Sequence, residues 1–278
     1  MKVTLIYAYW SNRPFGMTWC DLPFALRDAG LPERLHQAGH DVVEMTVYSE
    51  GDEGEELAGG FQLAREIGGA IDVARKADEF PIVVCGSCSI AAAGVAASQL
   101  GGPKTGVVWC DAHPDLNTPE TSKSGLFEGM ALAVATGRAW QMLASDMAGV
   151  TPFSIGAVTL YGARDIDPPE QDLLAEFSVA VERDARAINV RLETTDQTYV
   201  HLDMDVHGEL DVRANRFAVP DGPSVDEVRD TLLQVDRLAV LAVTGLDPSV
   251  DGSKAALSVA IDHICALADA GKGGVHDA

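Results

Sequence analysis

The segment TGVVWCDAHPD, residues 105–115, places a short apolar run directly before three potential metal ligands. The β-branched run 105–110 is typical of a buried strand. Asp111, His113 and Asp115 follow at alternate positions, and alternate residues of an extended chain project to the same side. Two carboxylates and one imidazole would then converge on one point, which predicts a metal site. A polar strand-to-loop transition is the alternative, because Asp and Pro are common in turns.

Apolar runs of strand length alternate with stretches of helical periodicity along the whole chain. We expect strands over 3–8, 41–48, 81–85, 105–110, 154–161, 198–202 and 238–243. We expect helices over 32–38, 55–77, 90–100, 130–136, 225–235 and 253–268. Two prolines, Pro168 and Pro169, should delay another helix until Glu170. Strands separated by long helices predict an α/β fold: a doubly wound, mostly parallel sheet with helices on both faces. One domain, residues 1–278, accounts for this pattern.

The charge balance excludes several classes of partner. The chain has 42 acidic and 20 basic residues, a formal net charge of −22, and no cluster of Lys and Arg. Nucleic acid and anionic membranes are therefore excluded as partners. Its five cysteines are too few and too scattered for a disulfide framework, and no apolar run approaches the roughly 18 residues of a membrane span. With a strand-like N-terminus in place of a leader, we expect a cytoplasmic protein.

A second strand ends in acidic residues. The segment YVHLDMD, residues 199–205, delivers Asp203 and Asp205 two positions apart. Because ligands bind at the carboxyl ends of parallel strands, the two segments should place four aspartates and one histidine at one edge of the sheet. Carboxylates packed so closely repel one another unless a cation compensates them. The pair of motifs therefore predicts a dinuclear site for divalent metal ions with shared carboxylates.

Four motifs occur in the order and spacing of the arginase, or ureohydrolase, family: CGSCS at 85–89, DAHPD at 111–115, HLDMD at 201–205 and GLDP at 245–248. The chain resembles that family over roughly residues 82–248. The resemblance implies a three-layer α/β sandwich that carries two manganese ions at the strand ends. It also implies metal-dependent hydrolysis of a guanidino or amidino group.

The resemblance assigns roles to individual residues. Asp111 and Asp203 match the carboxylates that bridge the two ions, and Asp115 matches a ligand of the first ion that also orients the attacking water. His113 and Asp205 match ligands of the second ion. For the substrate, Asn117 and Ser124 match contacts to an α-carboxylate, and Asp167 and Glu170 match contacts to an α-amino group. These matches imply a small guanidino amino acid as the substrate.

The sequence departs from the family pattern at three positions. Cys88 stands where the family has a ligand histidine. A thiol at the start of a helix should have a lowered pKa, so Cys88 can still bind a metal as a thiolate. Sulfur favours zinc or iron, whereas the surrounding oxygen donors favour manganese, which is the metal we expect.

Glu128 replaces the family's proton-shuttling histidine, and Gly245 replaces the glutamate that binds the guanidinium. A carboxylate at 128 could act as an acid or base if burial raises its pKa. Without a buried anion at position 245, a substrate with a cationic head group should bind more weakly. We therefore expect a less basic substrate, Nω-hydroxy-L-arginine, hydrolysed to hydroxyurea and L-ornithine. These departures resemble a branch of the family that serves antibiotic biosynthesis.

Other interpretations remain open at this level. Cys85 and Cys88 have the spacing of a redox pair. The two replaced histidines would also suit a family member that binds a metal or ligand without turnover. An arginase or a different amidinohydrolase is a further alternative. Trp10, Phe15 and Trp19 could cover the site, although loop packing would explain them equally well. We expect a monomer, because few residues follow the last helix.

Overall fold

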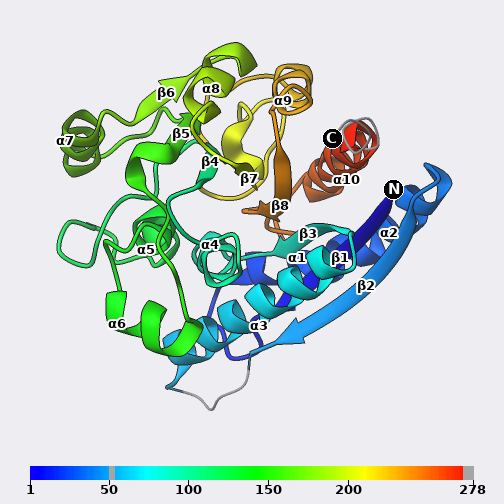
Figure 1. Ribbon diagram of the computed structural model, residues 1–278, viewed down its shortest axis with the longest axis horizontal. Coiled ribbons are helices and arrows are strands. Elements are labelled where there is room, and N and C mark those ends of the chain that lie inside the picture. Colours follow the sequence, from blue (N-terminus) through cyan, green and yellow to red (C-terminus); the bar gives the residue numbers. More distant parts are fainter. Residues whose placement is uncertain (50–53, 272–278) are drawn as a thin grey trace.

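The computed structural model describes residues 1–49 and 54–271. Within these ranges, eight parallel strands form one sheet in the spatial order β2-β1-β3-β8-β7-β4-β5-β6 (Figure 1). The strands are β1 Lys2–Tyr9, β2 Asp41–Tyr48, β3 Phe80–Cys85, β4 Thr105–Cys110, β5 Val158–Tyr161, β6 Ala180–Glu182, β7 Gln197–Asp203 and β8 Leu238–Thr244. The predicted doubly wound α/β fold is confirmed, and the sheet is parallel throughout.

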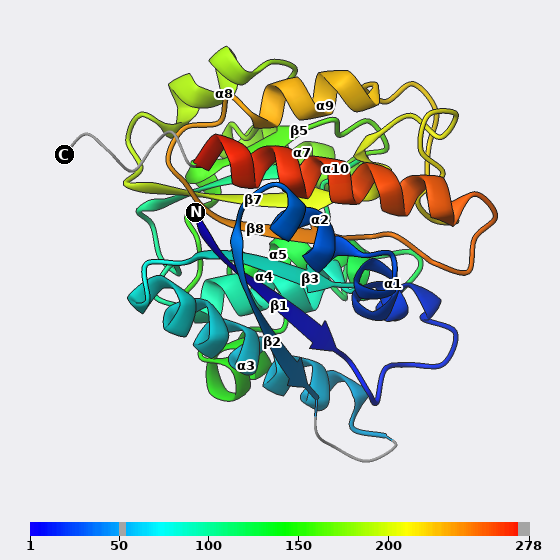
Figure 2. The same ribbon diagram turned by 90° about the vertical axis from the view of Figure 1, so that its right-hand side faces the viewer.

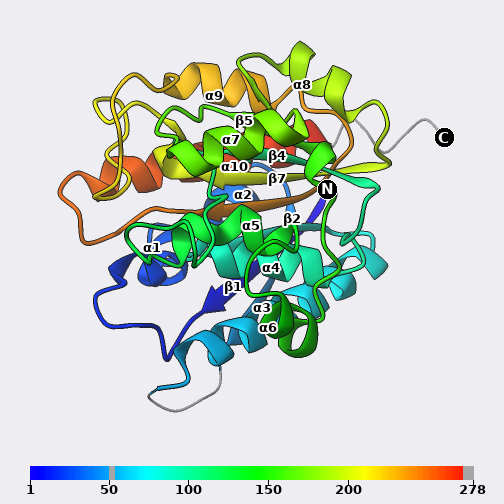
Figure 3. The same ribbon diagram turned by 90° about the vertical axis from the view of Figure 1, so that its left-hand side faces the viewer.

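Helices cover both faces of the sheet. Figure 2 shows α8, α9 and α10 on one side and α3 and α4 on the other, and Figure 3 shows the same layers from the opposite direction. The first face carries α1 Leu22–Asp28, α2 Leu31–Gln37, α8 Ala185–Leu192, α9 Val225–Leu232 and α10 Ser253–Gly271. The second face carries α3 Glu56–Lys76, α4 Cys88–Ala97, α5 Ala131–Ala135 and α7 Pro168–Phe177, and the short α6 is Gln141–Leu143.

Alternation within the strands builds one core on each face. In β1, Ile6 and Ala8 belong to the core that contains α3 and α4, whereas Leu5 and Tyr7 belong to the core that contains α1 and α2. All four residues are buried. Full burial of an aliphatic side chain contributes about 1.5–3 kcal/mol. Because both faces are covered, the strand sequences are nearly continuous apolar runs.

The expected start of the helix after β5 is wrong. Helix α7 begins at Pro168, two residues before Glu170. The backbone N–H groups in the first turn of a helix have no acceptor within the helix. Proline lacks this N–H, so Pro168 and Pro169 are compatible with the first turn. Glu170 then folds back, and its Oε2 accepts the N–H of Asp167 at 2.9 Å. This turn fixes the position of Asp167 beside the site.

Four elements were not expected from the sequence. They are α1, α8 and the short α6 and β6. The start of α8 does carry a local signal, because Asp184 accepts the N–H of Ala187 as a helix cap. Strand β5 begins at Val158, because Ile155–Ala157 form a 3₁₀ turn. No helix in the described ranges combines the length and apolar character needed to cross a membrane.

Candidate metal centre and substrate cavity

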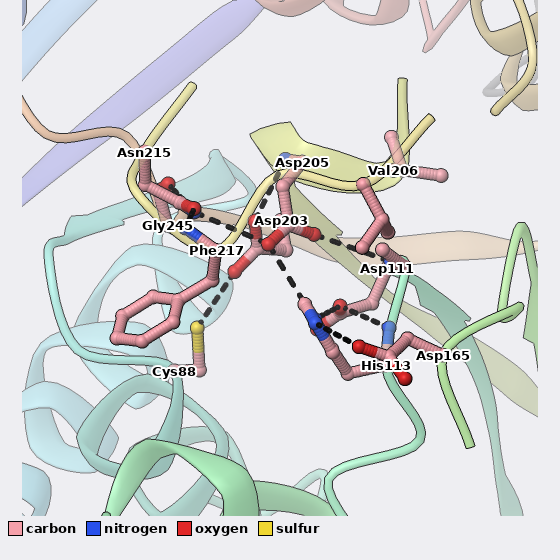
Figure 4. Close-up of polar contacts among 12 residues, drawn as sticks. Cys88, Asp111, His113, Asp165, Asp203, Asp205, Val206, Asn215, Phe217 and Gly245 are labelled. Atoms are coloured by element: carbon pink, nitrogen blue, oxygen red, sulfur yellow. Dashed lines mark hydrogen bonds and ion pairs between the residues drawn. The ribbon is translucent and has the colours of Figure 1, made fainter. Parts of the chain in front are cut away.

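The carboxyl ends of three strands bring the predicted ligands together. Asp111 and His113 follow β4, Asp203 ends the neighbouring β7 and is followed by Asp205, and Cys88 opens α4 just after β3. Figure 4 shows these side chains pointing toward one another. The three aspartates are at most 4 % exposed. The arrangement expected from alternate spacing and a common sheet edge is therefore observed.

Asp111, His113 and Asp205 form the tightest group. One ligand atom from each lies within 4.8 Å of the others, and no other such group occurs in residues 1–49 and 54–271. The Nδ1 atom of His113 is 3.2 Å from Asp111 Oδ1 and 3.5 Å from Asp205 Oδ2. Its other ring nitrogen, Nε2, is 3.8 Å from a carboxylate oxygen of Asp165. A carboxylate in that position typically orients a metal-binding histidine.

The carboxylates repel one another strongly. Burial and the neighbouring Asp205 raise the pKa of Asp111 to about 7. Burial, together with Asp205 and Asp111, raises the pKa of Asp203 well above its usual range. Burial lowers the pKa of His113, but the Asp111 and Asp205 carboxylates outweigh this effect and raise it to about 10. Acidic groups packed without compensating cations cost stability, so they indicate a functional site.

Cys88 lies among these acids. Its Sγ is 3.0 Å from Asp203 Oδ2 and 3.4 Å from Thr244 Oγ1. The expectation of a lowered thiol pKa is wrong: burial, and then the carboxylates of Asp203 and Glu128, raise the pKa of Cys88 well above its usual value. A bound cation would favour the thiolate again.

The donor set fits divalent metal ions. Six predicted ligands line one cavity: Cys88, Asp111, His113, Asp115, Asp203 and Asp205. Together they offer carboxylate oxygens, one imidazole and one sulfur, and their uncompensated charge disfavours the metal-free state. The cysteine pair has a simpler explanation than redox chemistry. Cys85 is buried in the core, all five cysteines are free, and Cys88 faces the acids.

The cavity has a volume of about 280 Å³ and extends from the acidic cluster to the loop after β4. Asn117, Ser124 and Asp167 line its far wall. Asn117 donates to Asp167 at 3.2 Å, so the two residues expected to contact substrate are already paired. Glu170 is 4 % exposed, and its two oxygens accept the backbone N–H groups of Leu116 and Asp167 at 2.9 Å. It therefore joins the loop that follows β4 to the loop that follows β5.

Only one of the three aromatic residues that could have covered the cavity lines it. Trp19 does so together with Phe217, and their ring centroids are 6.0 Å apart. Trp10 is buried in the core and donates from its indole nitrogen to Glu56 O, and Phe15 is fully exposed. Packing, the alternative explanation, therefore holds for Trp10, and Phe15 does not cover the cavity. Sequence spacing alone does not decide which side of a loop faces a cavity.

Comparisons with known proteins place this geometry in a family. The family model described as "Arginase family" matches residues 22–268. The chain belongs to the arginase family. Its members are metal-dependent hydrolases that act on guanidino groups, and this chain is accordingly an arginase-family amidinohydrolase.

Individual relatives differ in their substrates. The chain is 28 % identical over 237 residues to an N(omega)-hydroxy-L-arginine amidinohydrolase of Streptomyces lavendulae, covering 83 % of this chain and 84 % of that protein. It is 32 % identical over 207 residues to an arginase of Bacillus subtilis, covering 67 % and 68 %. The crystal structure of arginase from Bacillus cereus superposes with a TM-score of 0.85 at 26 % identity, covering 96 % and 97 %.

In this arginase-family chain, Glu128 begins the 3₁₀ turn Glu128–Met130, and its carboxylate contacts the start of α4. Its Oε2 accepts hydrogen bonds from Ser87 Oγ at 3.0 Å and from Ser89 N at 3.2 Å. No hydrogen-bond partner within the described residues reaches its buried Oε1. Burial raises the pKa of Glu128 to about 7, although these hydrogen bonds oppose the shift. Glu128 can therefore hold or release a proton near neutral pH.

Gly245 closes the other end of the cavity in this arginase-family chain. Its φ is +68°, and a Cβ atom added there would lie only 1.9–2.1 Å from the Asp203 carboxylate. A side chain is therefore excluded unless Asp203 moves. The neutral amide of Asn215 lies beside it and donates to Gly245 O at 2.6 Å and to Asp205 Oδ2 at 3.2 Å (Figure 4). This end of the cavity therefore has no room for an acidic side chain at position 245.

Several residues of the site were not expected from the sequence. Asp165 follows β5, in the segment that also carries Asp167, so its position at a strand end was a usable signal. Asn215 and Phe217 come from the irregular segment between β7 and α9, where no local pattern indicates which side chains face the cavity. Only tertiary packing places them there.

Proposed function

We propose that this protein hydrolyses the guanidino carbon of Nω-hydroxy-L-arginine, releasing hydroxyurea and L-ornithine, with two manganese ions held by the six predicted ligands. The observation that carries the proposal is the absence of space for a side chain at Gly245. A cationic guanidinium would find no carboxylate at that position. An N-hydroxyguanidine is less basic, because its hydroxyl group withdraws electrons, so it can bind as the neutral form. The relative named N(omega)-hydroxy-L-arginine amidinohydrolase, which aligns with 83 % of the chain, supports this choice.

The amino acid end of the substrate would bind at the far wall of the cavity. Asn117 and Ser124 offer polar groups to an α-carboxylate, and Asp167 offers an anion to an α-ammonium. The substrate would exchange the contact between Asn117 and Asp167 for contacts of its own. Glu170, whose oxygens hold both loops, would fix the spacing of these groups.

At the reacting end, bound divalent ions would lower the pKa of water and supply a nucleophile near neutral pH. Asp111 and Asp203 would be ligands of the ions, and Asp115 would orient the attacking water. Glu128 would protonate the departing nitrogen, because burial raises the pKa of Glu128 to about 7. Trp19 and Phe217 would cover the head group and exclude bulk water.

Glu128→Gln should lower kcat by about 10²–10⁴-fold, the usual contribution of general acid–base catalysis. A glutamine keeps the size of the side chain and an oxygen that can accept from Ser87 and Ser89, but it cannot transfer a proton. Steady-state kinetics and metal content of the purified variant would be measured together, and metal content should not change. The exposed Glu176→Gln on α7 is the matched control. An unchanged kcat would limit Glu128 to holding the start of α4.

A competition assay tests the proposed substrate. The manganese-loaded protein is supplied with L-arginine and Nω-hydroxy-L-arginine together, and urea and hydroxyurea are separated by mass spectrometry. We expect kcat/KM to favour the hydroxylated substrate by at least about 30-fold, equivalent to the roughly 2 kcal/mol lost when a buried charge has no partner.

Each other outcome identifies an alternative. Faster release of urea would make the protein an arginase, as the 32 % identical relative from Bacillus subtilis is named. Release of ornithine from neither compound, with metal bound, would indicate a different amidinohydrolase or a family member without activity.

A further inference from the structure

A continuous series of buried polar groups leads to the sulfur of Cys88. Tyr199 Oη is 2.7 Å from His201 Nδ1, and His201 Nε2 is 3.0 Å from Thr244 Oγ1. Thr244 Oγ1 is in turn 3.4 Å from Cys88 Sγ, which is 3.0 Å from Asp203 Oδ2. Tyr199, His201 and Thr244 are all 0 % exposed. We call these three residues the buried chain.

The strands explain this alignment. Tyr199, His201 and Asp203 occupy alternate positions of β7 and therefore point to the same face of the sheet. Thr244 is paired with Asp203 in the neighbouring β8, and Cys88 opens the helix that covers this face. The sequence motif Y-x-H-x-D thus contains the buried chain together with a predicted metal ligand.

The hydrogen bonds of the buried chain can be assigned from its tyrosine end. The Tyr199 hydroxyl donates its single hydrogen to His201 Nδ1, its partner in the described part of the chain. A neutral imidazole then carries its hydrogen on Nε2, which donates to Thr244 Oγ1. The threonine O–H is left to donate to Cys88 Sγ. Every hydrogen of the buried chain then has an acceptor.

The opposite direction is unfavourable. It would turn the buried Tyr199 hydroxyl hydrogen away from His201, which is its hydrogen-bond partner in the described part of the chain. A buried donor without a partner costs about 1–3 kcal/mol. The His201 ring is held in place, because it stacks on Trp109 with centroids 3.6 Å apart and an interplanar angle of 3°.

We infer that the buried chain is a positioning device for Cys88: Tyr199 and His201 orient the Thr244 hydroxyl so that it donates a hydrogen bond to the metal-binding sulfur. The inference rests on the proposed function, because it takes Cys88 as a ligand. A thiolate buried among carboxylates needs such a donor, and groups that hydrogen-bond to ligands commonly contribute 10–100-fold to metal affinity. The buried chain thereby stabilises a sulfur ligand at a position surrounded by acids.

Cobalt(II) titration of the metal-free, full-length protein tests this inference. A thiolate bound to cobalt gives a charge-transfer band in the near ultraviolet, which reports on the Cys88 position alone. Thr244→Val is isosteric and removes the hydroxyl, and we expect it to need about 10–100-fold more cobalt to develop the band. Thr244→Ser, which restores the hydroxyl, should titrate like the wild type. His201→Phe keeps a ring against Trp109 and should behave like Thr244→Val.

Thr159→Val, at a buried strand threonine on β5 outside the buried chain, is the matched control. Tyr199→Phe and Thr244→Val break different links, so either variant decides the question if the other does not fold. The inference is overturned if Thr244→Val develops the band at the same cobalt concentration as the wild type. It is also overturned if the wild type gives no band. Because no substrate is present, failure to hydrolyse hydroxyarginine would leave these results unaffected.

Discussion

Asp203→Asn is expected to abolish binding of the metal pair while making the metal-free protein more stable. Asparagine keeps an oxygen to accept the N–H of Asp205, a bond of 2.8 Å in this structure, but it cannot act as a charged ligand shared by two ions. The loss of metal affinity should exceed the roughly 10–100-fold that removal of an outer hydrogen-bond partner costs. Hydrolysis should fall to background with it.

The gain in metal-free stability has an electrostatic cause. Burial and the carboxylates of Asp205 and Asp111 raise the pKa of Asp203. The ionised form of Asp203 therefore destabilises the folded state. A neutral isostere relieves this repulsion. The thermal midpoint should rise by about 2–4 °C for each kcal/mol relieved in a chain of this size.

Metal titration calorimetry and thermal melts, each with and without manganese, measure both effects. Asp172→Asn, at an exposed position of α7, is the control and should change neither. Loss of stability in metal-free Asp203→Asn would contradict the proposed repulsion. Full retention of both ions would contradict its assignment as a shared ligand.

Arg164→Met should destabilise the fold by about 4 kcal/mol or more, at the extreme of single substitutions. The guanidinium of Arg164 lies 2.8–3.1 Å from six backbone carbonyl oxygens, those of Gly162, Asp205, Val206, His207, Val219 and Pro220. Three of these belong to the turn that carries Asp205. Methionine fills the space of the aliphatic stem but removes the guanidinium donor from all six carbonyls, of which Val219 O keeps the N–H of Glu209.

Urea unfolding measures this effect as a lower midpoint at an unchanged slope. Arg164→Lys should lose less stability than Arg164→Met but should not restore the wild-type value, because an ammonium cannot reproduce the planar fork. Arg186→Met, at an exposed position of α8, is the control. A change for Arg164→Met within that of the control would show that water replaces the guanidinium at little cost.

Local patterns in the sequence predicted most of the strands and helices. The strands 41–48 and 105–110 have the expected bounds, and the capping box that joins Ser224 and Glu227 starts α9. These signals are strong because periodicity and capping act within a few residues. Prediction failed where a rule depends on position within an element, as at Pro168, which was expected to exclude a helix and instead begins one.

For the site too, some features could be predicted from the sequence and others could not. Asp111, His113, Asp203 and Asp205 could be predicted because they follow strand ends, and parallel strands bring their carboxyl ends to a common edge. The pKa of Cys88 could not, because it depends on burial and on carboxylates distant in the sequence. The sequence marked Glu128 as a departure from the family pattern, but only its contacts with Ser87 and Ser89 show how it is held.

The sequence by itself determined the alternation of strands and helices, the ligand motifs and the missing side chain at Gly245, because each is a property of residue types at fixed spacing. Only the tertiary structure decided that Asp203 fills the space beside Gly245 and that His201 reaches Cys88 through Thr244. These contacts join the start of α4 to β7 and to the end of β8. The two strands are adjacent in the sheet, but all three elements are far apart along the chain. Hydrogen-bond direction and electrostatic repulsion depend on distances in space, which no local pattern specifies.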